Sequence, residues 1–139
     1  MNNEMKCVMI IDGELPTGII ANTAAILGIT LGKHIPALVG DDIPDGSGMI
    51  HRGIITIPVP VLKAPGALIK ALRERLSGTE YRSLITADFS DVAQSCNVYS
   101  DYRKKAAATQ ECDFTYLGLA LYGEKKLVNS LTGSLPLLR

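Results

Sequence analysis

The turn between the first predicted strand and the first predicted helix contains residue types that bind small ligands. It reads DGELPTG and ends in Thr17 and Gly18, and Asn22 follows about one helical turn later. The first backbone amides of a helix have no partner inside it, so these amides and the Thr17 hydroxyl can receive an anion. An ordinary capped turn is the structural alternative, because a Thr-Gly pair lacks the fingerprint of a phosphate-binding loop.

Asp88 and Thr115 are polar residues at the ends of later predicted strands. A carboxylate at a strand end within a cleft can act as a base or hold a polar ligand, and a structural cap is the alternative for Asp88. Thr115 has no catalytic partner at a suitable spacing nearby, so its local surroundings favour a core or turn role. The helix dipole alone explains Asp91, which is expected in a first helical turn.

The sequence contains no recognisable metal or cofactor motif. His34 and His51 lie 17 positions apart, without the i, i+4 spacing of a metal-binding helix, and the three cysteines form no CxxC pair. The signatures GxSxG, HExxH and GxxxxGK[ST] are absent. We therefore expect no metal and no cofactor, and we expect both histidines to be surface or hydrogen-bonded residues.

The composition indicates one aliphatic core and no strong electric field. Of the 139 residues, 47% are hydrophobic and 20% charged, with 14 acidic and 14 basic side chains and no tryptophan. Such a balanced chain has no overall attraction for nucleic acid, so tRNA is not an expected partner. The sequence shows no signal-peptide pattern and no apolar run near the ~20 residues that cross a bilayer. We expect a cytoplasmic protein without a membrane partner.

Strand and helix patterns alternate along the chain. Strands are predicted at KCVMIID, at YRSLITADF, at TYLGLALYG and at HRGIITIPVPVL, the last as an edge strand or as a strand that ends near Pro58. Helices are predicted from Thr17, as N-cap, to Gly32, over Ala64–Leu76, from a Ser90 cap onward, and at GEKKLVNSLTG. The fold class is therefore α/β. We expect a single domain over residues 1–139, a three-layer sandwich whose four-stranded, mostly parallel or mixed sheet has helices on both faces.

The long connection after the first helix has the composition of a surface segment. Its stretch DIPDGSG is typical of a turn or hairpin, and PALVG allows a short helix.

Three stretches together resemble the type 2 peptidyl-tRNA hydrolases. These are MKCVMIIDGELPTGIIANTAA, LKAPGALIKAL and TYLGLALYGEKKLVNSLTGSLPLL, and the resemblance runs from end to end with residues 34–48 as an apparent insertion. The chain resembles still more closely a bacterial family called domain of unknown function two thousand, which shares that fold. This second resemblance lies in LPTGIIANTAAILG, HRGI, IPVPVLKA, DFSDVAQ and ALYGEKKLVNSLTGSLPLLR. It implies no assigned activity.

The hydrolase resemblance assigns roles to individual positions. It makes Asp88 and Thr115 candidate catalytic residues, since they match the family's aspartate and threonine. The family's essential lysine falls at Ile19, and its glutamine and histidine fall near Thr23 and Ile26. Loss of a positioned cation commonly costs several kcal/mol of transition-state stabilisation. We therefore predict a hydrolase-like scaffold that has lost this reaction.

Three functional hypotheses follow. The first is a domain that binds a small ligand, or an uncharacterised enzyme, with a strand-end cleft lined by Thr17, Gly18, Asn22, Asp88 and Thr115. The second is a residual peptidyl-tRNA hydrolase in which Lys63 or Lys33 supplies the missing cation. The third is a non-enzymatic module that forms a homodimer through its apolar first helix and the tail SLPLL.

Overall fold

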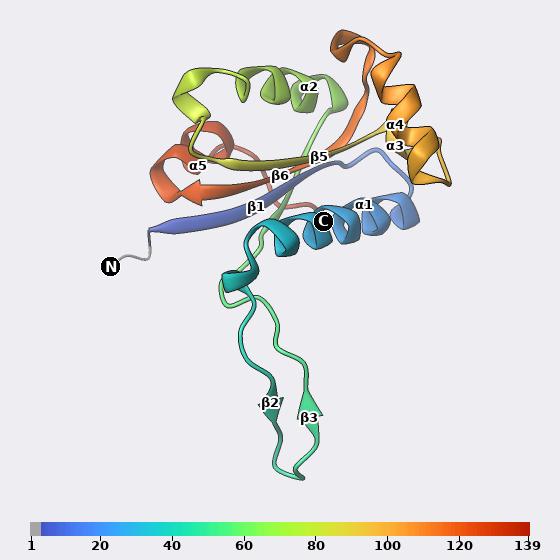
Figure 1. Cartoon of the computed structure of the whole chain (residues 1–139). Coiled ribbons are helices and arrows are strands. Elements are labelled where there is room, and N and C mark those ends of the chain that lie inside the picture. Colours follow the sequence, from blue (N-terminus) through green and yellow to red (C-terminus); the bar gives the residue numbers. More distant parts are fainter. Residues whose placement is uncertain (1–3) are drawn as a thin grey trace.

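A four-stranded mixed sheet forms the centre of the computed structural model, which describes residues 4–139 (Figure 1). The strands are β1 (Met5–Asp12), β4 (Val61–Ala64), β5 (Ile85–Ser90) and β6 (Tyr116–Glu124). Their order is β4-β1-β6-β5. β4 is parallel to β1, whereas β6 is antiparallel to both β1 and β5, so three strands run in one direction. The mixed sheet expected from the sequence is confirmed.

Helices cover both faces of this sheet. Helix α1 (Thr17–His34) lies on one face, and α2 (Gly66–Arg75) and α5 (Lys125–Thr132) lie on the other (Figure 1). The central strand β1 is buried on both faces, which explains its continuous apolar sequence. The three-layer α/β architecture is therefore confirmed.

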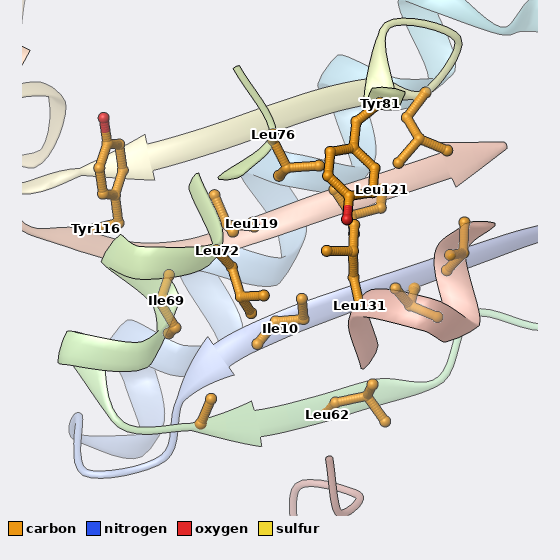
Figure 2. Close-up of a cluster of buried hydrophobic side chains, with 14 residues drawn as sticks. Ile10, Leu62, Ile69, Leu72, Leu76, Tyr81, Tyr116, Leu119, Leu121 and Leu131 are labelled. Carbon is orange, nitrogen blue, oxygen red and sulfur yellow. The ribbon is translucent and has the colours of Figure 1, made fainter. Parts of the chain in front are cut away.

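Each face of the sheet has its own hydrophobic cluster. Figure 2 shows the cluster under α2 and α5, whose labelled side chains include Ile10, Ile69, Leu72, Leu119 and Leu131. The cluster under α1 includes Met9, Leu27, Leu31, Phe89 and Leu117. Alternate residues of β1 and β6 thus point to opposite faces.

Helix α1 begins differently from the prediction. Its N-cap is Pro16, with no side-chain capping hydrogen bond, so Thr17 lies inside the helix and the predicted Thr17 cap is wrong. The Pro16 carbonyl accepts the backbone N–H groups of Ile19 and Ile20. The helix also continues past Gly32 to His34. Among residues 4–139, none of the helices has the combined length and hydrophobicity of a transmembrane segment.

The strand predicted in HRGIITIPVPVL is an edge strand, which confirms one alternative, but an end near Pro58 is wrong. The sheet strand is β4, which begins after the prolines, and most of residues 50–60 lie outside the central sheet. Pro58 and Pro60 have no N–H to donate to a neighbouring strand. The Pro60 carbonyl accepts the N–H of Met9 at 3.0 Å, and regular pairing starts at Val61.

The segment around β5 corrects two further predictions. Pairing with β6 continues to Ser90, so Asp88 lies within β5 rather than at its end. Ser90 caps the following helix as predicted, because its Oγ accepts the N–H of Ala93 at 3.4 Å. That helix is divided into α3 (Asp91–Gln94) and α4 (Tyr99–Ala107). Ser95 donates to the Val92 carbonyl at 2.9 Å, a local bond that competes with helix continuation.

A β-hairpin projects from the body of the protein between α1 and β4 (Figure 1). It contains β2 (Ile43–Pro44) and β3 (Ile50–His51) and follows a short 3-10 helix at Pro36–Leu38. We call residues 40–54 the arm. The hairpin predicted at DIPDGSG and the short helix at PALVG are both confirmed.

The last residues of the chain extend the sheet beyond β4. Lys63 donates its backbone N–H to the Pro136 carbonyl, and Leu138 donates to the Val61 carbonyl, both at 2.9 Å. An antiparallel bridge joins Leu62 to Leu137. We call residues 135–139 the tail.

Candidate functional site

A cleft of about 730 Å³, the tail cleft, opens where α1 begins. Three segments that are distant in the sequence form it: the turn after β1, the end of β4, and the tail. Its lining includes Glu14, Leu15, Thr17 and Ile20 from the turn and helix. Lys63 to Pro65 supply a second wall, and Leu135, Pro136, Leu138 and Arg139 supply the third.

Lys63 is held beside the turn by the register of the sheet. Its Cα pairs with that of Ile11, so its side chain emerges next to the turn that follows β1. A Cβ at Gly13 would lie 3.3 Å from both Cβ and Cδ of Lys63. Gly13 therefore gives the lysine stem room to lie against the turn.

The start of α1 contributes an electropositive end to the tail cleft. The helix is 18 residues long, its first turn contains no acidic residue, and no side chain caps it. The early N–H groups and the helix dipole therefore favour a negative group there. Among the side chains of the residues that line the cleft, those of Lys63 and Arg139 are cationic and that of Glu14 is anionic. The apolar remainder comes from side chains such as Leu15, Ile20 and Leu138.

Asp88 lies in a different hollow, of about 470 Å³, beside the edge strand β5. Thr30 from α1 and Cys96, Tyr99 and Tyr102 from the α3–α4 region also line it. The Asp88 carboxylate pairs with Arg73 of α2, with 3.2 Å between Oδ2 and Nε. A base at this position would first have to separate from that guanidinium.

Two phenols near Asp88 stay protonated at neutral pH. The Tyr116 hydroxyl donates to Glu111 Oε2 at 2.7 Å. Burial, followed by this bond and the nearby Asp88 charge, raises the pKa of Tyr116. Burial and then the charge of Asp88 also raise the pKa of Tyr102. These hydroxyls are therefore hydrogen-bond donors rather than bases.

Thr115 lines neither hollow and is exposed. Its N–H donates to Asp91 Oδ1, and its carbonyl accepts the N–H of Asp91, both at 2.9 Å. Asp91 thus fixes the backbone just before β6, in addition to its place at a helix start.

The five predicted site residues are not brought into one cavity. Thr17 lines the tail cleft and Asp88 lines the hollow beside β5. Gly18 and Asn22 are exposed on α1 and line neither hollow.

Comparison with known proteins shows which family this chain belongs to. The model of a family described as protein of unknown function (DUF2000) matches residues 5–139. The chain belongs to the DUF2000 family. This DUF2000 protein is similar to a solved structure, that of a protein of unknown function from Agrobacterium tumefaciens strain C58. The TM-score is 0.87, with 17% identity and 98% of each chain covered. This likeness shows the fold alone, and no curated protein matches the chain.

Three positions of α1 in this DUF2000 protein, which the hydrolase resemblance singled out, lie away from the tail cleft. Ile19 is half-buried and packs against the cluster under α1. Thr23 is fully buried and donates to the Ile19 carbonyl at 2.7 Å. Ile26 lines the hollow beside β5. None of these side chains lines the tail cleft.

Sequence reasoning missed Glu14 and Arg139 as cleft residues of the DUF2000 protein. Glu14 lies within the predicted turn DGELPTG, so its position was a usable signal. Arg139 reaches the cleft only because the tail pairs with β4. The tail sequence SLPLLR carries no strand alternation that predicts such pairing.

Proposed function

We propose that this protein binds a small organic anion with an apolar part in the tail cleft. The observation that carries the proposal is the meeting of Thr17, Lys63 and Arg139 at the uncapped start of α1. A carboxylate or phosphate group of the ligand would lie at the helix N-terminus, between the two cationic side chains.

The shape and lining of the cleft support a ligand that is apolar beyond its anionic group. Its volume of about 730 Å³ is within the range of small-molecule sites, roughly 300–1,000 Å³. Leu15, Ile20, Leu135 and Leu138 present aliphatic surface to it. The proposal does not require Asp88 or Thr115, since both lie outside this cleft.

Thermal denaturation with a panel of anions tests this function. The panel comprises aliphatic carboxylates of increasing length, 2-oxo acids and phosphate monoesters. A true ligand at 100 times its Kd stabilises the fold by about 2.7 kcal/mol and raises the melting temperature. Lys63→Ala should abolish the rise, whereas Lys126→Ala on the exposed part of α5 should preserve it.

Two results would contradict the proposal. One is a panel in which no anion raises the melting temperature of the unmodified protein. The other is a rise that is equal in Lys63→Ala and Lys126→Ala, because it would indicate binding elsewhere.

A residual hydrolase acting on peptidyl-tRNA is a second candidate function. The observation that favours it is the position of Lys63 beside Thr17, since this lysine could supply the cation that Ile19 cannot. A direct assay of peptidyl-tRNA cleavage tests it. We expect turnover above the buffer rate that disappears in Lys63→Ala; a rate equal to that of buffer excludes the activity.

A further inference from the structure

We propose that two copies of this chain form a homodimer in which the arm of each copy lies on α1 of the other. The interface is independent of the tail cleft and of the anion proposed there. It would join two surfaces of the described chain that leave large apolar side chains exposed to solvent.

The arm carries large aliphatic side chains that its own body leaves in solvent. Ile43, Met49, Ile50 and Ile54 are between 59% and 77% exposed. All four belong to the arm, which projects from the body of the protein (Figure 1). Such a concentration of apolar surface is typical of a protein-protein contact.

The outer face of α1 is the second half of the proposed interface. No charged residue occurs from Thr17 to Gly32, although a surface helix normally has a charged face. Its exposed side includes Ala21, Ala25 and Ile29, and Ile29 is 75% exposed. An apolar hollow of about 240 Å³ lies between α1 and the base of the arm. It can receive an aliphatic side chain from a second copy.

The chain exposes more surface than a compact protein of its mass, which leaves area for such a contact. The accessible surface is 8643 Å². A compact monomer of 14.9 kDa is expected to expose only roughly 7,000 Å². A standard interface buries about 800 Å² on each partner. The chain therefore exposes roughly 1,600 Å² more than expected. This excess is about twice the area that each partner buries in a standard interface.

The arm has a defined path despite its exposure. Asp45 accepts the N–H groups of Ser47 and Met49 at 2.9 and 3.0 Å and pairs with His51 at 2.8 Å. The contacts of Asp45 hold the turn of the arm in place, so its exposed apolar side chains are presented in a fixed arrangement.

A second copy fits better than a different partner because each chain carries both complementary surfaces. A two-fold axis would bury both arms and both helices at once. The base of the arm carries Asp41 and Asp42, and the end of α1 carries Lys33 and His34. The arm as a whole has three aspartates and one arginine, whereas the charges of α1 are confined to its basic end, so the two surfaces carry opposite net charge.

Light scattering with size-exclusion chromatography tests the dimer over a range of protein concentrations. The expected mass of the unmodified chain is twice 14.9 kDa. Ile43→Asp on the arm and Ile29→Asp on α1 should each give monomers with unchanged circular dichroism. Leu68→Asp is the control, since Leu68 is an exposed aliphatic residue on α2, and it should leave the dimer intact.

Mixing the two disrupted variants tests the arm-to-helix arrangement. Ile43→Asp retains an intact α1 and Ile29→Asp retains an intact arm, so a mixture restores one of the two contacts. We expect the mixture to associate more strongly than either variant alone. Association that Ile29→Asp leaves unchanged would overturn contact with α1.

Removal of the arm gives an independent test. Gly40 donates to the Ile54 carbonyl at 2.9 Å at the base of the arm, so an Asn-Gly turn can replace residues 41–52. None of those twelve residues belongs to the buried core. The shortened protein should fold as a monomer. A monomeric unmodified chain at every concentration, or a dimeric shortened chain, would overturn the proposal.

Discussion

Arg73 on α2 and Asp88 on β5 form an ion pair across the edge of the sheet, with 3.2 Å between Nε and Oδ2. Their side chains are 30% and 27% exposed, respectively. The pair attaches a helix to an edge strand, and it neutralises the carboxylate that sequence reasoning selected as a catalytic candidate.

We expect this ion pair to contribute modestly to stability. Arg73→Ala and Asp88→Ala should each lower the free energy of unfolding, and the coupling between them should be about 0.5–1 kcal/mol because solvent still screens the pair. Urea denaturation of both single variants and the double variant measures it. Strictly additive losses would show that the two side chains do not interact in solution.

Tyr116 should make the stability of the fold decline at alkaline pH. Its folded-state pKa is raised by burial and by Glu111. The contribution is therefore complete below the unfolded-state pKa of about 10 and is lost as pH rises through the folded-state value. Tyr116→Phe should flatten the loss of stability above that pH, while Tyr99→Phe, at an exposed ring, should not. Denaturation curves at several alkaline pH values would refute this if both variants behaved alike.

Gly118 should tolerate no side chain. A Cβ at this position would lie 2.8 Å from Thr23 Cγ2, because β6 passes close under α1. Gly118→Ala should therefore cost about 1–3 kcal/mol in unfolding free energy. Thr23→Ser, which removes that methyl group, should recover part of the loss in the double variant. Gly46→Ala is the matched control, since a Cβ there meets nothing within 4 Å.

Cys7 should not react with thiol reagents while the protein is folded. It is 1% exposed, and burial raises the pKa of its thiol. A thiol reagent should therefore modify the exposed Cys112 quickly and reach Cys7 only when the fold opens. In Cys96→Ser/Cys112→Ser, the slow reaction of the remaining thiol should accelerate with added urea. Rapid modification without urea would contradict the buried position of β1.

Local patterns were sufficient for the elements that lie at the core. The apolar run of β1 and the helical spacing of α1 predict both elements because burial on the sheet dictates them. Local patterns did not predict the position of β4. Its four residues follow two prolines, and they form a strand because they pair with β1, which is distant in the sequence. Long-range packing also determines the partner of Arg73, which its amphipathic helix alone assigns to solvent but which reaches Asp88.

The candidate site, like the fold, was predicted only where local sequence patterns determine it. Thr17 was predicted from its turn, and the structure places it in the tail cleft. Asp88 was predicted from its expected position at a strand end, but it lies on β5, at the opposite edge of the sheet from the tail cleft that Thr17 lines. Sequence order gives neither the order nor the separation of strands within the sheet, so it could not tell one cavity from two.

The tail that forms a wall of the cleft also closes an otherwise open sheet margin. β4 is an end strand, and unpaired N–H and C=O groups on such a strand are a template for intermolecular β-pairing. Lys63 and Val61 use these groups to hold Pro136 and Leu138. We therefore expect that a ligand bound in the cleft changes the tendency of the protein to aggregate. A molecule that bridges Lys63 to Arg139 should suppress aggregation, whereas one that wedges the tail away from β4 should promote it.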